Sequence, residues 1–172
     1  DKSSGKSAEG FYTYLSDSSD RSTISDDEIR SLYIDGEGVL WIGTTSGLNK
    51  AIINYEELNK GNYKSALKIT RYLNDKNNSN SLGHNFVSSI TENAKGDLYI
   101  GTMGGGLNLF KKSSEKFFRL KSNPADTNSL SSNYVLKLHA GNSGTLWIAT
   151  YGGGLCRYNE ETKKFRSFNH NP

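Results

Sequence analysis

Few residues of this chain combine the side-chain types and the spacing that catalysis needs. The histidines His84, His139 and His170 are far apart in the sequence, so none forms a local metal-ligand pair. Asp75 and Asp126 could act as the acid and base of a glycosidase or glycan lyase, but each lies among Asn and Ser residues typical of turns. The sequence therefore favours a non-enzymatic protein and leaves such an enzyme as an alternative.

The glycine-rich segments and the single cysteine do not point to a cofactor either. The glycine runs at 104–106 and 152–154 are each followed by an apolar segment, with no Lys-Ser or Lys-Thr pair, which argues against a phosphate-binding loop. Cys156 is the only cysteine, so no internal disulfide or cysteine-based zinc cluster can form. We expect Cys156 to be a small buried residue, and we predict no catalytic residue, no metal and no cofactor.

Composition excludes further classes of function. The 172 residues include 21 basic and 18 acidic side chains, for a net charge of +3, and the two signs are interspersed. Without a basic stripe, we expect no nucleic-acid partner. No apolar run approaches the roughly 18 residues of a membrane span, and the polar start is unlike a signal peptide, so we expect no membrane contact within this segment.

The elements that would position any binding residue come from a motif that occurs three times. Each copy reads Leu, an aromatic residue, Ile, Gly or Ala, and Thr, followed by a glycine-containing turn and Leu. An aliphatic residue precedes each aromatic at the same distance, since 41−29, 99−87 and 147−135 all give 12. The copies are 58 (99−41) and 48 (147−99) residues apart, which is typical of β-propeller blades. They occupy residues 40–48, 98–107 and 146–155.

Each repeat predicts four antiparallel strands. Alternation in the second strand sends the aromatic residue to a face where it would fill the space between neighbouring blades. Gly38, Gly96 and Gly144 close the preceding hairpins, where a positive φ costs glycine nothing. The predicted fold is all-β, with about three four-stranded antiparallel blades in a partial propeller or one completed by oligomerisation. The expected strands are 29–34, 40–44, 48–52 and 66–72, then 87–91, 98–102, 107–110 and 116–120, then 135–139, 146–150, 155–158 and 164–168.

The strand pattern also sets the domain organisation. An insertion at 54–65 could contain a helical turn at 55–58, and residues 11–14 resemble the outer strand of a further blade. His139 ends a first strand, and we expect it to be packed. The predicted divisions are a disordered or linker start at 1–10 and a partial propeller at 11–172, with blade 1 at about 24–72, blade 2 at about 82–121 and blade 3 at about 130–169.

Connectivity predicts where a ligand would bind. If each first strand is innermost, the fourth-to-first connections and the second-to-third turns share one face, and the insertion lies on the opposite face. Propeller ligands usually enter near the central axis, where such loops converge. Tyrosine rings there could stack on a sugar, and amides could pair with its hydroxyls. The candidate ligand-binding residues are Thr45, His84, Asn85, Met103, Asn133, Tyr134 and Tyr151, with Phe86 beside them.

The repeat resembles a known family. Residues 81–87 and 129–135 both read Ser-Leu-x-x-Asn-x-Val and precede the strand motif in register, a pattern similar to the two-component regulator propeller repeat. The resemblance covers roughly residues 11–172, and the chain's end at 168–172 looks like the start of another such loop. The first repeat departs from the pattern, because Ile24–Ile29 replaces Leu-x-x-Asn-x-Val.

The resemblance implies a function. Members of this family form the periplasmic sensor region of hybrid two-component systems in Bacteroidetes, anchored in the inner membrane, and they respond to oligosaccharides. A histidine kinase would then lie outside this chain, which contains none of the kinase motifs. The partners so implied are an oligosaccharide and either the remaining blades of the same sensor or a second copy of the chain. The alternative is a protein-interaction or dimerisation scaffold without its own ligand site.

Overall fold

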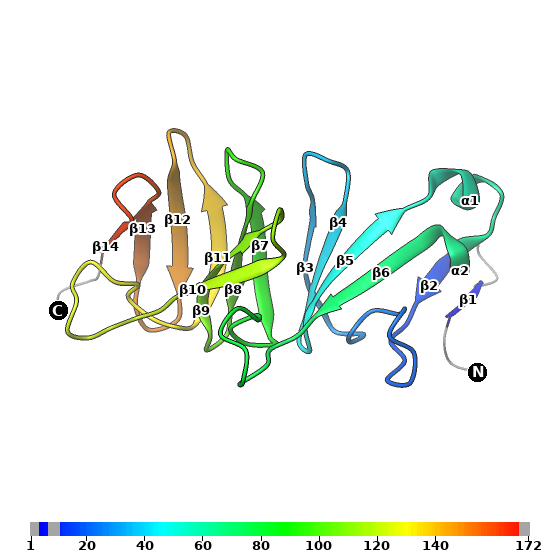
Figure 1. Ribbon diagram of the computed structural model, residues 1–172, viewed down its shortest axis with the longest axis horizontal. Coiled ribbons are helices and arrows are strands. Elements are labelled where there is room, and N and C mark those ends of the chain that lie inside the picture. The colour runs from blue at the N-terminus through cyan, green and yellow to red at the C-terminus, as the bar shows by residue number, and fades with distance from the viewer. Residues whose placement is uncertain (1–3, 7–10, 169–172) are drawn as a thin grey trace.

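Three four-stranded antiparallel sheets stand side by side in the computed structural model, which describes residues 4–6 and 11–168 (Figure 1). Each sheet is one repeat with its strands in sequence order, so the predicted all-β propeller blades are confirmed. Blade 1 contains β3 (Ile29–Ile34), β4 (Leu40–Thr44), β5 (Leu48–Ile53) and β6 (Leu67–Tyr72). Blade 2 contains β7 (Val87–Glu92), β8 (Leu98–Thr102), β9 (Gly106–Lys111) and β10 (Lys116–Leu120). Blade 3 contains β11 (Val135–Ala140), β12 (Thr145–Thr150), β13 (Leu155–Asn159) and β14 (Lys164–Phe168).

The three blades repeat even their irregularities. The pairing of first and second strands shifts register once in each blade, after Ile29, Val87 and Val135. Such a bulge bends the strand and increases its twist. The hairpin glycines have positive φ values, 79° at Gly38 and 81° at Gly96, as the sequence predicts. The same local chemistry therefore builds each blade to the same plan.

The segment before blade 1 forms a small sheet of its own. β1 (Ser4–Lys6) lies within the start at 1–10 that the sequence predicted to be disordered or a linker, and it pairs with β2 (Tyr12–Tyr14), which falls in the predicted strand at 11–14. The insertion forms α1 (Tyr55–Asn59) and α2 (Tyr63–Ala66), and the Tyr14 hydroxyl donates to the Tyr63 carbonyl at 2.8 Å. The predicted helical turn is therefore present. Predictions for residues 1–3, 7–10 and 169–172, His170 included, fall outside the described residues.

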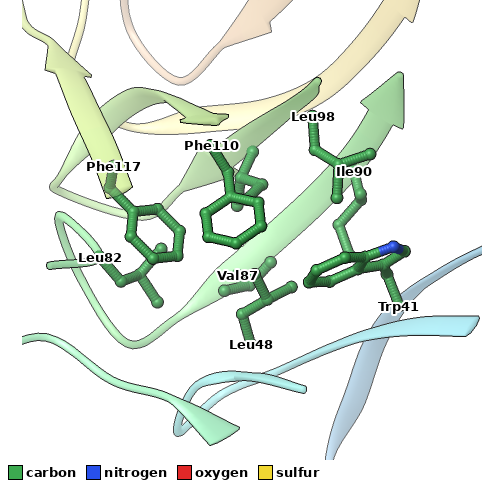
Figure 2. Packing of buried hydrophobic residues seen from close by; sticks show 9 residues of the cluster. Trp41, Leu48, Leu82, Val87, Ile90, Leu98, Phe110 and Phe117 are labelled. Carbon is green, nitrogen blue, oxygen red and sulfur yellow. The ribbon is translucent and has the colours of Figure 1, made fainter. Parts of the chain in front are cut away.

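The hydrophobic core lies between the blades rather than inside them. Trp41 and Leu48 of blade 1 pack against blade 2 in one cluster of buried residues (Figure 2). Tyr99 and Leu107 of blade 2 make the equivalent cluster with blade 3. Both aromatic residues are almost fully buried, which confirms the predicted role of this position. The blade 2 residues of the first cluster are Leu82, Val87, Ile90, Leu98, Ile100, Phe110 and Phe117.

Glycine beside each aromatic lets the blades approach closely. A Cβ atom at Gly43 would lie 2.6 Å from Val87 Cγ1, and one at Gly101 would lie 2.6 Å from Val135 Cγ1. The first strands of neighbouring blades also bond directly, since the Ser88 hydroxyl donates to the Val135 carbonyl at 2.5 Å. The first strand of each blade is therefore the one that meets the next blade most closely.

The two ends of the row present uncovered blade faces. Leu32 and Ile34 of blade 1 are 64% and 59% exposed, whereas Ile90, which aligns with Leu32, is buried against Trp41. At the other end His139 is exposed, so the prediction that it is packed was wrong. His139 aligns with Tyr33, which packs against blade 2, and no blade follows blade 3 among the described residues. Cys156, in contrast, is fully buried as expected.

Candidate ligand-binding face

The loops predicted to converge on one face do so. The long connections before β7 and β11 lie along the lower edge in Figure 1, together with the turns between second and third strands. The hairpins between first and second strands lie along the upper edge, and α1 lies on the same side of the molecule. We call the lower edge the loop face and the upper edge the hairpin face.

One main-chain hydrogen bond recurs on the loop face of every blade. The amide after the motif threonine donates to the carbonyl of the residue just before the first strand. The three bonds are Thr45 N to Glu28 O at 3.2 Å, Met103 N to Phe86 O at 3.0 Å and Tyr151 N to Tyr134 O at 2.8 Å. The repeat therefore places the candidates Thr45, Met103 and Tyr151 at equivalent points, whatever their side chains.

Blades 2 and 3 bring four candidate residues together. Met103 forms an isolated β-bridge with Tyr134, whose carbonyl receives the Tyr151 amide. His84 and Tyr134 both flank Gly104, because a Cβ there would lie 3.7 Å from His84 Cδ2 and 3.8 Å from Tyr134 Cε1. Tyr134 is 50% exposed and Tyr151 is 70% exposed. We call His84, Met103, Tyr134 and Tyr151 the aromatic strip.

The two candidate asparagines serve the loops themselves. Asn85 Oδ1 accepts the Asn74 amide at 2.6 Å, and Asn133 Oδ1 accepts the Ser122 amide at 2.8 Å. Each bond ties the start of a long connection to its end. The recurrence of Asn in both loops therefore has a structural explanation, and their side-chain carbonyls are already occupied.

Thr45, the candidate residue of blade 1, has a carboxylate beside it instead of aromatic rings. Its hydroxyl donates to Asp26 Oδ2 at 2.5 Å, and the Ser46 hydroxyl donates to the same oxygen at 2.6 Å. These hydrogen bonds, with one from the Glu28 amide, lower the pKa of Asp26 to about 2. Asp26 was missed from the sequence, although it occupies the position of His84 in the degenerate first repeat. A ligand would therefore meet an ionised carboxylate at this blade.

The alternative catalytic carboxylates are used in turns. Asp75 Oδ1 accepts the Asn77 amide, and Asp126 Oδ1 accepts the Asn128 amide, both at 2.9 Å. Across residues 4–6 and 11–168, no group of three or more His, Cys, Asp or Glu side chains is arranged to hold a metal ion. No helix in that part of the chain is long and apolar enough to cross a membrane.

Part of the first repeat matches a known family. Residues 23–46, which run into the motif strand of blade 1, match the family model for the two-component regulator propeller. The first repeat is thus similar to the two-component regulator propeller repeat. The matched segment belongs to the repeat that departs most from the shared pattern, and the other two repeats follow it in register.

Solved structures share the fold of these repeats. The extracellular domain of a protein assigned to the hybrid two-component systems of B. thetaiotaomicron matches 85% of this chain at 24% identity, with a TM-score of 0.71. Another extracellular domain from B. thetaiotaomicron, assigned to a one-component system, matches 95% at 20% identity, also with a TM-score of 0.71. This chain covers only 19% and 21% of those two chains.

The fold is shared with an enzyme as well. Virginiamycin B lyase from Staphylococcus aureus matches 97% of this chain at 18% identity with a TM-score of 0.60, and this chain covers 48% of the lyase. No curated protein matches the chain. The structural similarity establishes the shared propeller fold. Because the sequence identities are low, the activity must be argued from the residues of the chain.

Proposed function

We propose that this chain is a non-enzymatic segment of the periplasmic sensor region of a hybrid two-component system, whose loop face binds an oligosaccharide. The family of the repeats and the shared fold with extracellular domains from B. thetaiotaomicron support the sensor role. The observation that carries the ligand site is the pair of exposed tyrosines, Tyr134 and Tyr151, joined through their main chains on the loop face. The histidine kinase would lie outside this chain.

The aromatic strip has suitable chemistry for a sugar. A tyrosine ring offers a flat apolar surface for the C–H face of a pyranose, and its hydroxyl offers a hydrogen bond at the edge. His84 adds ring nitrogens, although its Nδ1 accepts the Phe86 amide at 3.1 Å. A ligand switches such a sensor only if it binds the two signalling states with different affinity, and a coupling of about 1–3 kcal/mol is ordinary.

Calorimetric titration with a panel of oligosaccharides tests this function. We expect saturable binding of one glycan class, weakened about tenfold in Y151A and in Y134A because each change removes a stacking surface. Y55A is the matched control, since Tyr55 is 61% exposed but lies on α1 at the hairpin face. Binding that survives both loop-face changes, or no binding of any glycan, would contradict the proposal.

The uncovered blade faces support a second candidate function, a dimerisation or docking scaffold. Leu32 at one end and Leu155 at the other are exposed, although the equivalent residues of blade 2, Ile90 and Leu107, are buried, and Ile34 and Phe168 are exposed apolar residues on the same two blades. Exposed strand edges and apolar faces promote association. Light scattering during size-exclusion chromatography tests the scaffold: a discrete dimer supports it, and a mass near the 19.0 kDa of one chain favours cover by further blades of the same sensor.

A further inference from the structure

A cavity of about 390 Å³ opens on the hairpin face, between blades 2 and 3. Its walls are the hairpins that follow β7 and β11, and Tyr33, Tyr99 and Glu160 also line it. This volume suits a small ligand. Every lining residue belongs to the three blades, so the cavity does not depend on what covers the uncovered ends. It also lies on the face opposite the aromatic strip, so a ligand bound in it would be independent of the proposed oligosaccharide site.

The equivalent place between blades 1 and 2 holds a cation of the chain itself. Lys112 Nζ lies 2.7 Å from Asp35 Oδ2 and 2.8 Å from Glu92 Oε1. The strand register aligns these three residues with others at the second junction. There Glu160 takes the place of Lys112, Asn93 that of Asp35 and Ala140 that of Glu92. At the second junction a carboxylate, Glu160, thus stands in place of the lysine. The small side chain of Ala140 stands in place of Glu92 and leaves space.

Glu160 is held in place by neutral donors only. Its Oε1 accepts the Tyr99 hydroxyl at 2.5 Å and Asn93 Nδ2 at 2.8 Å. No lysine or arginine among the described residues lies within 4.0 Å of its carboxylate, and Oε2 accepts no hydrogen bond from them. Lys95, Lys111 and Lys163 line a neighbouring cavity that also borders Glu160, and none of the three lines this one. The carboxylate therefore lacks the counter-charge that Lys112 supplies at the first junction.

We propose that this cavity binds a small organic cation, with its primary ammonium group beside Glu160 and against the rings of Tyr33 and Tyr99. An ammonium satisfies the free carboxylate oxygen, and tyrosine rings attract a cation placed over their faces. A neutral molecule of the same shape gains neither interaction and leaves Glu160 as it is. The ligand thus restores, from outside the chain, the charge pairing found between blades 1 and 2.

Cyclohexylammonium and cyclohexanol form the matched pair of probes, because they share a ring and differ in charge. Titration followed by tyrosine fluorescence and by NMR chemical shifts should show the ammonium binding at least about tenfold more tightly. In E160Q this preference should be lost, while E161Q, a change at an exposed neighbour that does not line the cavity, should keep it. The glutamine keeps an acceptor for Tyr99, so the variant should fold.

Two results would overturn the proposal: equal binding of the two probes to the unaltered chain, or unchanged ammonium binding in E160Q. Y33L tests the aromatic wall without touching Glu160 and should weaken the ammonium alone. Y151A should leave the ammonium affinity unchanged, since Tyr151 lies on the loop face. Loss of glycan binding in Y151A, with ammonium binding kept, separates this site from the proposed oligosaccharide site.

Discussion

The junction between blades 1 and 2 and the junction between blades 2 and 3 share an apolar design and differ in their polar contacts. In both, an aromatic residue, a leucine and a close glycine–valine contact join the sheets. At the first, the Trp41 indole nitrogen donates to Asp35 at 2.8 Å, and Lys112 neutralises that carboxylate. At the second, Tyr99 donates across the junction to Glu160.

The difference shows that the polar contacts at a junction vary independently of its apolar packing. Burial alone would raise the pKa of Asp35, but hydrogen bonds from Lys112 and Trp41 outweigh it and lower that pKa. Burial alone would lower the pKa of Lys112, and its bonds to Asp35 and Glu92 raise it instead. At the second junction, burial and then the bond to Glu160 raise the pKa of Tyr99. Blade packing thus repeats, while the charges at the junction vary freely.

Removing the shared aromatic residue should have the largest effect. W41A leaves a cavity between two blades and should lower the free energy of unfolding by about 3–5 kcal/mol. W147A, at the same position of blade 3, should cost less than half as much, because Trp147 is only partly buried and no blade covers it among the described residues. Urea unfolding measures both. Equal losses would mean that the blade 3 face is covered in solution.

Removing the cation of the first junction should come next. K112M leaves Asp35, whose side chain is 0% exposed, without its counter-charge, and should cost about 3 kcal/mol. K111M is the matched control, since Lys111 is 36% exposed and its pair with Asp97 should contribute about 1 kcal/mol or less. If K112M costs no more than K111M, the buried ion pair does not stabilise this junction.

The pH dependence of the free energy of unfolding should distinguish the two junctions in acid. The lowered pKa of Asp35 means that its stabilising effect is present above the ordinary carboxyl range and is lost as the pH falls through the lowered value. D35N should cost about 2 kcal/mol at neutral pH and progressively less in acid. Unfolding measured across the acid range checks this, and a constant cost at every pH would contradict it.

Removing the Tyr99–Glu160 hydrogen bond between blades 2 and 3 should have the smallest effect on stability. Y99F removes one hydrogen bond to Glu160 and should cost about 1 kcal/mol, with the loss confined to pH values below the alkaline range. The raised pKa of Tyr99 stabilises the fold below the ordinary phenol value, and that effect is lost as the pH rises through the raised value. Phenolate absorbance should show Tyr99 among the last tyrosines to ionise in the folded chain.

The sequence predicted the blades well because their signals are local. Strand alternation, hairpin glycines and the recurring aromatic are each read within one repeat, and the structure confirms all three. His139 was misjudged because its burial depends on a following blade rather than on its own strand. Asn85 and Asn133 recur because each accepts a hydrogen bond that closes its own loop, which only the structure reveals. Thr45 was predicted to bind ligand, but its hydroxyl already donates a hydrogen bond to Asp26.

By itself the sequence determined the repeat, the four strands of each blade, the aromatic residues between blades and the division into a loop face and a hairpin face. These features depend on periodicity and turn chemistry, which act over a few residues. The tertiary structure alone decided that Lys112 pairs across a junction while Glu160, at the equivalent point, lacks a cation and borders a cavity. Such pairings join residues of different blades, and only the packing of one sheet on the next brings them within reach.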